Sequence, residues 1–403
     1  MRFVLAVVLI ALAVGTGRTD PIVSEQSLID SVLQDERERA VLDEPLAGAS
    51  SESAQLKVLD NPELSYLRES LGQESRQQTW TLSWTLPLDG RQRLKGQAAD
   101  ATVRAAESRR EASRNQLRAQ AREAFAKWVI AEESSAVGER VALLVDRLAR
   151  QAESSAAEGE ASALSARRLL LARIEVRAQA ARLMAELAHA RARIRVWMPG
   201  LAPTSRPARP ALPPVPGDST AWVRSPHLIA LEREIRQAEV LAGLANRFWA
   251  LPEWSIGRQA AQGGSDEITG PVYGVRWRLP VFDRQQGDRI ATRGRLTGVR
   301  ARLELEQARA REDFAAAVTS YTLLRESAEL SLLAGPAGTS ALTGAVALFD
   351  SGEADMTDLL ESIRGVLSAE LAALDSYGAA LRAHRELELT TGQSLPLTEG
   401  AGR

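Results

Sequence analysis

Large apolar residues occupy every second position in two short stretches of the chain. Hydroxyl residues fill the positions between them in the first stretch, and glycine and arginine do so in the second. A period of two predicts a β-strand with one apolar face and one polar face. The apolar positions are Trp80, Leu82, Trp84 and Leu86 in the first stretch and Tyr273, Val275, Trp277 and Leu279 in the second.

A further strand precedes each of these stretches, so the pattern predicts two β-hairpins. The first hairpin begins at Asn61-Pro62, because a residue before proline is confined to extended backbone, and it turns over the polar stretch 71–78. The second begins with the alternating Trp254 and Ile256 and turns over the glycine-bearing stretch 263–270. The chain therefore carries four predicted strands.

A very long helical pattern follows each hairpin. It covers 89–158 after the first hairpin and 283–349 after the second, with apolar positions at helical spacing and alanine at most interior positions. At 1.5 Å per residue, such a helix extends roughly 100 Å. A returning helix about half as long follows in each case, over 161–197 and 355–389.

Two landmarks recur at one offset. Pro87 marks the first strand–helix junction and Pro280 the second, 280 − 87 = 193 residues later. Gly159 and Gly352 each begin a tight turn before a returning helix, and 352 − 159 is again 193. Two unrelated landmarks with one offset indicate a tandem duplication. Each half far exceeds the roughly 20–50 residues of solenoid repeats. The two turns are Gly159-Glu160 and Gly352-Glu353.

Proline marks two interruptions of this pattern. Gly335-Pro336 predicts a break in the second long helix, because proline removes a backbone hydrogen bond and clashes with the preceding turn. Six prolines between 203 and 216 predict an extended linker. The expected order is a first repeat over 61–198, the proline-rich linker over 199–221, a second repeat over 222–395 that opens with a helix, and a tail over 396–403.

The N-terminus has the pattern of an export signal. Arg2 precedes the apolar run 3–14 and a group of small residues, which predicts a secretory signal peptide over 1–19. A short membrane anchor is the alternative, although the run is shorter than the roughly 20 residues that span a bilayer. Residues 20–60 are expected to form a short helix, capped by Ser24, and then a polar connection.

Composition removes several classes of function. The 403 residues carry a net charge of −2, so no overall basic surplus points to nucleic acid. The chain has no cysteine, which excludes disulfides and thiolate metal sites. His189, His227 and His384 stand apart, without the spacing of metal ligands, and are expected on the surface or in helix packing. No phosphate loop or nucleophile motif occurs. We therefore expect no enzyme, no cofactor and no bound metal ion.

The two-faced strands fit two environments. In a soluble sheet the apolar face is buried, whereas in an outer-membrane barrel it faces lipid and the polar face lines a lumen. Aromatic residues in and beside the strands suit the girdles found at membrane interfaces. Arg276 and Arg278 share the polar face of their strand, so they would line the lumen of a barrel or stay solvated on a soluble sheet.

Each half thus reads strand, strand, long helix, glycine turn and returning helix, and this order resembles the TolC family of outer-membrane efflux proteins. The resemblance covers about residues 60–395. Its motifs are Leu86-Pro87 and Leu279-Pro280, the turn 349–361 with Gly352 and Asp358-Leu359-Leu360-Glu361, and Tyr377 with His384 in the last helix. The details look most like the outer-membrane component of heavy-metal (cobalt–zinc–cadmium type) efflux systems, through Asn61-Pro62-Glu63-Leu64, Arg224-Ser225-Pro226-His227-Leu228 and Pro336.

The resemblance implies a mainly α-helical chain with a small β part. Three copies would form a homotrimer with a 12-stranded β-barrel in the outer membrane, in contact with its lipid, and a barrel of helices in the periplasm. Oligomerisation also follows from physics, since four strands cannot close a barrel and open edges are not tolerated in lipid. The duct would carry metal cations or small toxic compounds passively, with a periplasmic adaptor protein and an inner-membrane RND-type pump as partners.

The resemblance also places a periplasmic gate at the second glycine turn. Asp358 and Glu361 fall on the positions of the family's aperture acids, about one helical turn apart on one face. The alternative is that both are ordinary first-turn acids favoured by the helix dipole. The rival to the whole interpretation is a secreted or periplasmic coiled-coil structural or interaction protein, whose hairpins would bury their apolar faces internally.

Overall fold

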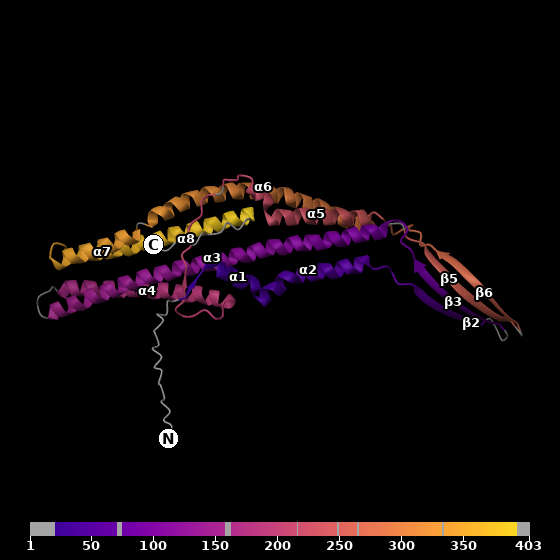
Figure 1. Cartoon of the computed structure of the whole chain (residues 1–403), viewed down its shortest axis with the longest axis horizontal. Helices are drawn as coiled ribbons and strands as arrows, with labels where there is room; N and C mark the ends of the chain where they lie inside the picture. Colours follow the sequence, from indigo (N-terminus) through magenta and orange to yellow (C-terminus); the bar gives the residue numbers. More distant parts are fainter. Residues whose placement is uncertain are drawn as a thin grey trace, which may run out of the picture.

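A small sheet projects from one end of a long bundle of helices (Figure 1). This arrangement is that of a computed structural model of the chain, which describes residues 21–70, 75–157, 163–215, 217–247, 250–263, 266–332 and 334–392. The expected signal peptide and C-terminal tail lie outside the described residues, and so do Gly159 and Glu160.

The expected pairing of long and returning helices is confirmed. α3 is the longest, with 67 residues, and α4 packs along it with 35 residues. In the second half, α8 packs with its 36 residues along α6 and α7. The helices of both halves are α3 (Arg91–Ala157), α4 (Ala163–Trp197), α5 (Pro226–Ala245), α6 (Gln286–Ser331), α7 (Ala334–Asp350) and α8 (Met356–Thr391).

α3 is the spine of the bundle, because α2, α4, α5 and α8 all pack against it. Alanine makes this possible: Ala98, Ala99, Ala105 and Ala121 are completely buried on α3. A methyl side chain lets neighbouring helix axes approach closely and loses no rotamer freedom in the helix. One helix therefore receives neighbours on several sides along most of its length.

The second long helix is interrupted where the glycine–proline pair predicts a break. α6 ends at Ser331 and α7 begins at Ala334, so Pro336 falls in the first turn of α7, where its missing N–H is tolerated. By length and composition alone, the stretch Gln286–Asp350 contains one window apolar enough to cross a membrane, with a mean hydropathy of 1.5. Only 6% of that window is buried, so this helical stretch leaves apolar surface uncovered in the single chain.

The four predicted strands form one antiparallel sheet in the order β2-β3-β5-β6. The two hairpins are therefore joined through β3 and β5. The strands run further than the alternating pattern predicts, into the stretches expected as turns, because paired backbone groups extend the ladder through polar residues such as Gln77 and Gln78. The strands are β2 (Glu63–Ser70), β3 (Ser75–Thr85), β5 (Glu253–Gly263) and β6 (Asp266–Arg276).

The N-terminal segment differs from the expectation. Ser24 caps the first helix as predicted, since its Oγ accepts a hydrogen bond from the Ser27 N–H at 3.2 Å. The stretch 40–59, however, is helical up to residue 57 rather than a polar connection. Its charged residues are compatible with a helix because they lie at the surface and pair with α3, as Asp43 does with Arg110 (Oδ1–Nε 2.5 Å). The two helices are α1 (Glu25–Gln34) and α2 (Glu36–Lys57).

The proline-rich linker is extended, as predicted, but it is seated on the helices. Its short strand β4 (Arg206–Pro207) pairs in parallel with β1 (Ile22–Val23), and the 3₁₀ turn η1 (Ala221–Arg224) ends it. Two buried tyrosines bind its backbone: Tyr321 donates to the Pro213 carbonyl at 2.5 Å, and Tyr377 donates to the Pro210 carbonyl. The linker thus connects the two halves in an extended conformation that hydrogen bonds hold against the helices.

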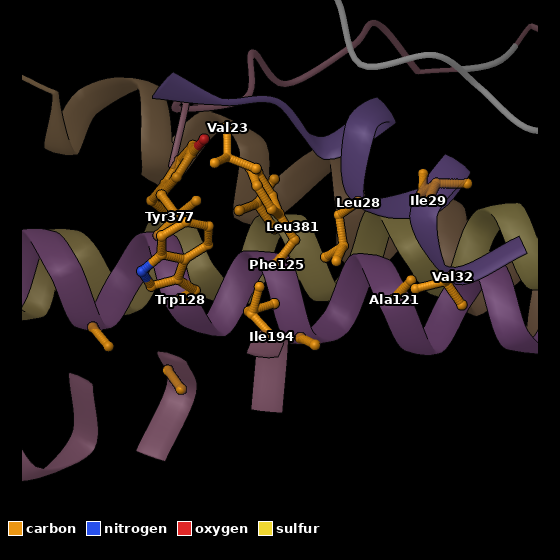
Figure 2. Close-up of a cluster of buried hydrophobic side chains, with 14 of the residues drawn as sticks. Val23, Leu28, Ile29, Val32, Ala121, Phe125, Trp128, Ile194, Tyr377 and Leu381 are labelled. Carbon is orange, nitrogen blue, oxygen red and sulfur yellow. The ribbon is translucent and has the colours of Figure 1, made fainter. Parts of the chain in front are cut away.

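The main core lies where α1, α3, α4 and α8 meet (Figure 2). Phe125 and Trp128 on α3 are completely buried and contact each other edge to face, with ring centroids 6.0 Å apart. Leu28 and Val32 of α1 are equally buried on this cluster. Burial of such side chains contributes roughly 1.5–3 kcal/mol each, so α1 is held as part of the core.

Charged groups are also buried beside this core. Glu25 Oε1 of α1 lies 3.7 Å from Arg122 Nε of α3, and Arg122 forms a close ion pair with Glu388 of α8. Burial raises the pKa of Glu25 to about 7, against the opposing effect of Arg122. Burial likewise lowers the pKa of His384 to about 4, and Arg122 adds to this. His384 is thus a buried helix-packing residue, and its ring lies tilted against that of Tyr321 with the centroids 5.2 Å apart.

The buried Glu25 predicts a pH dependence of stability. Between pH 4.5 and about 7 the folded chain keeps a proton on Glu25 that the unfolded chain has released, so this group makes the fold less stable as the pH rises. The free energy of unfolding of Glu25→Gln, relative to that of the wild type, should therefore rise with pH by up to about 1.4 kcal/mol per pH unit in this window. The measurement is urea unfolding in detergent across the window, with the exposed Asp30→Asn on the same helix as the control for charge loss. A difference that stays constant across the window would contradict the prediction.

Candidate functional site

The strand register gathers the large apolar side chains on one face of the sheet. One row crosses all four strands, from Leu64 through Leu82 and Ile256 to Tyr273. Opposed residues of an antiparallel sheet point to the same side, and these four are between 45% and 74% exposed. Nothing in the described chain covers this face. We call it the apolar face; its further members are Tyr66, Trp80, Trp84, Trp254 and Val275.

The opposite face is polar. The row Glu63, Ser83, Ser255 and Gly274 crosses the same four strands. At the end of the sheet nearest the helices, the row Thr85, Glu253 and Arg276 belongs to this side as well. Arg276 Nη1 lies 3.6 Å from Glu253 Oε1. The sheet therefore has one face of apolar and one of polar residues, as the sequence pattern predicts.

Three of the strand residues singled out from the sequence lie just beyond the strand ends. Leu86 follows the end of β3, and Trp277 and Leu279 follow the end of β6. Trp277 is held there by a hydrogen bond from its Nε1 to the Ala250 carbonyl at 2.9 Å. Arg278 also follows β6, so the strand alternation does not fix its side.

The two strand–helix junctions have the same local geometry. The Leu88 N–H donates to the Leu86 carbonyl across Pro87, and the Val281 N–H donates to the Leu279 carbonyl across Pro280, both at 2.9 Å. Asp89 and Asp283 then accept a backbone N–H two residues further on, at 3.0 and 2.8 Å. Proline lacks an N–H and has a fixed φ, so each junction ends the strand ladder and turns the chain into the helix.

The turn at Gly352 closes α7 with a pair of crossed hydrogen bonds. The Glu353 N–H donates to the Leu348 carbonyl at 2.9 Å, and the Gly352 N–H donates to Phe349 at 3.1 Å. This is the Schellman pattern, which needs a left-handed residue after the helix. Gly352 supplies it with a φ of +76°.

Asp358 has a structural role at the start of α8. Its N–H donates to Asp355 Oδ1 at 2.8 Å, while its own Oδ2 accepts the Asp355 N–H at 3.2 Å. These two bonds form a capping box. The Asp358 N–H holds the pKa of Asp355 below its usual range. Asp358 and Glu361 are both exposed, so the turn presents two acids, of which one also caps the helix.

No protein-family model matches this chain. The cobalt-zinc-cadmium resistance protein CzcC of Cupriavidus metallidurans is 23% identical over 351 residues, which cover 84% of this chain and 82% of that protein. Among solved structures, CusC matches with a TM-score of 0.76 at 15% identity, over 95% of this chain and 96% of that one. The CmeC outer membrane channel of Campylobacter jejuni matches with a TM-score of 0.74 at 13% identity, over 91% of this chain and 85% of that one.

The chain has the fold of the TolC family of outer-membrane channels. The resemblance drawn from the strand–helix junctions and the glycine turn is thereby confirmed, and the sequence relative CzcC is of the heavy-metal kind named with it. Within the TolC fold, the sheet and the glycine turn of this chain lie at opposite ends of the helical bundle (Figure 1).

Side-chain bonds between the two helical hairpins complete the turn end of this TolC fold. Arg364 of α8 pairs with Glu175 of α4 (Nη2–Oε2 2.6 Å), and Arg168 of α4 donates to the Thr357 hydroxyl at 3.2 Å. No sequence signal foretells these partners, because they are 189 residues apart and meet only through packing. By contrast, Leu64, Tyr66, Trp254 and Ile256 of the apolar face could be found by their period of two.

The Schellman turn predicts that alanine has opposite effects on stability at two glycines. Gly352→Ala should destabilise the chain by about 1–2 kcal/mol, since a side chain is strained in the left-handed conformation. Gly344→Ala in α7 is the matched control: a Cβ there meets nothing within 4 Å, and alanine should stabilise a helix interior by up to about 1 kcal/mol. Urea unfolding in detergent measures both. Equal effects of the two substitutions would contradict the turn geometry.

Proposed function

We propose that the chain is the outer-membrane exit duct of an efflux system. The observation that carries this proposal is the sheet with one exposed apolar face and one polar face, attached to a bundle of helices of about 100 Å in the TolC fold. The apolar face would contact lipid, including Trp80, Leu82 and Trp84, and the polar face would line the lumen, including Arg276. A coiled-coil structural protein is less well supported, because it would bury the apolar face within the chain.

A homotrimer would complete the barrel. β2 and β6 are the two edge strands of the sheet, and an unpaired strand edge cannot remain in lipid, where each unsatisfied backbone group costs several kcal/mol. Pairing of β6 with β2 of a second copy removes both edges, and three copies of four strands give the twelve of the resembling family. The uncovered apolar stretch of α6 and α7 would find its cover in the neighbouring copy.

The similar protein CzcC supports the choice of cargo, and the family resemblance supports the choice of partners. CzcC is a cobalt-zinc-cadmium resistance protein, so divalent metal cations are the first candidates for the cargo, and small toxic compounds the second. In the described residues no group of three or more His, Asp or Glu could hold a metal ion, which suits a passive conduit. An inner-membrane RND-type pump would drive transport, and a periplasmic adaptor would dock at Gly352-Glu353 and at the turn that the sequence predicts at Gly159-Glu160.

Asp358 and Glu361 would ring the periplasmic aperture of the trimer. Rings of carboxylates attract cations and repel anions. The capping box of Asp358 is compatible with this role, because its carboxylate stays exposed at the turn. Glu361 has no capping role and is the better probe of the aperture.

The membrane assignment predicts opposite outcomes for neighbouring residues of β3. Leu82→Arg on the apolar face should cost about 2–4 kcal/mol near the membrane midplane and prevent recovery in the outer membrane. Thr81→Arg on the polar face should be recovered as a trimer-sized species. The measurement is cell fractionation followed by sizing in detergent. Normal membrane recovery of Leu82→Arg, or a soluble wild-type chain, would contradict the exit duct.

The aperture proposal predicts a change in ion selectivity. Glu361→Gln should lower the preference for cations in planar bilayers by about twofold or more, because one negative charge per copy is lost from a narrow ring. Asp375→Asn, an exposed acid further along α8, is the control and should leave the selectivity unchanged. If Glu361→Gln conducts with wild-type selectivity, Glu361 does not line the aperture.

A further inference from the structure

A hollow of about 760 Å³ lies where the sheet ends and both long helices begin. Thr85, Glu253 and Arg276, the last row of the polar face, form one wall. The other walls include Arg91 and Lys95 in the first turns of α3, together with both strand–helix junctions. The hollow therefore opens on the polar side of the sheet.

Cations in this hollow outnumber carboxylates, and two of them are unpaired. Arg276 lies beside Glu253, at 3.6 Å, and Arg91 lies 3.6 Å from Asp89. Lys95 and Arg278 also line the hollow, and neither has an ion pair or side-chain hydrogen bond among the residues that the structure describes. Positive charge is thus available to a ligand.

Two of the three carboxylates of the hollow already have a partner within it. Glu253 faces Arg276, and Asp283 accepts the Gln285 N–H at 2.8 Å. Asp60 is the remaining acid of the lining. The two long helices also begin here, since Arg91 opens α3 and Gln286 opens α6, and helix N-termini carry a partial positive charge. Backbone and side chains therefore favour an anion in the same space.

The sequence around the two strand–helix junctions also has a surplus of positive charge. In the windows 85–104 and 276–295 there are ten Lys and Arg against four Asp and Glu, so 10 − 4 gives +6, in a chain whose net charge is −2. The equivalent windows of the two repeats both contribute. The positive charge is thus concentrated near the two strand–helix junctions, whereas the chain as a whole is slightly negative.

We infer that this hollow is a binding site for small solute anions, such as carboxylates and phosphates, on the lumen side of the strand–helix junction. The inference rests on the proposed function, because the polar side is a lumen only if the sheet forms a barrel. In such a duct the acids Asp358 and Glu361 would attract cations at the periplasmic aperture. The hollow at the strand–helix junction would then lower the energy barrier to the passage of anions. Cargo would pass the junction most easily with its accompanying anions or as an anionic complex.

The test is the reversal potential of the trimer under a potassium chloride gradient, in planar bilayers of phosphatidylcholine. The double variant Lys95→Glu with Arg278→Glu should lower the permeability of chloride relative to potassium by about threefold or more, since two charges change sign in each copy. The neutral pair Lys95→Gln with Arg278→Gln should give a smaller shift in the same direction, and it keeps the test valid if the acidic pair does not assemble.

Arg93→Glu is the matched control, because Arg93 is an exposed cation of the same first turn of α3 that does not line the hollow. It should shift the selectivity less than the double variant. Conducting double variants with wild-type selectivity, or an equal shift by Arg93→Glu alone, would overturn the anion site and leave the exit duct intact. A wild-type chain that forms no conducting pore would overturn the exit duct itself.

Discussion

The unpaired edges of a four-stranded sheet are the constraint on which the rest of this molecule depends. In water an edge strand can bond to solvent, but a hydrocarbon layer offers neither donors nor acceptors. β2 and β6 each use only one side of their backbone within the chain, while their apolar side chains stand uncovered. In lipid the single chain would therefore be an incomplete unit, and its backbone alone would require a partner strand at each edge.

The helical part meets a different demand, that of keeping a very long element in place without a globular core. α3 satisfies it with alanine, which admits neighbours on several sides, and with one aromatic cluster near its middle around Phe125 and Trp128. The linker and α1 close over this cluster, held by Tyr321 and Tyr377. A second buried cluster, around Val145, Leu169 and Leu359, joins α3, α4 and α8 nearer the glycine turn. The bundle is therefore held by two separate clusters along its length.

Most of the architecture could be predicted from the sequence because its signals are local. Alternation gave the strands, glycine and proline gave the junctions and the turn, and one shared offset gave the duplication. The helical nature of 40–57 was missed, because its polar composition is that of a connection and its support comes from ion pairs with α3, such as Arg110–Asp43.

The candidate site also contains residues that local sequence patterns predict and residues that only packing brings together. The apolar face could be listed almost completely from its period, whereas the hollow at the junction and the Arg364–Glu175 pair could not, since their members come from distant segments. Asp358 shows the limit of a motif: its position matched the family pattern, but its hydrogen bonds with Asp355 became visible only in three dimensions.

The break between α6 and α7 has a consequence for any ring built from this chain. The two repeats share one order of elements, so a trimer would place six similar helical hairpins around one axis. α3 forms a continuous helix, while its counterpart is interrupted between Ser331 and Ala334. Continuous and interrupted helices would therefore alternate around the wall, so that its sixfold appearance would conceal a threefold symmetry.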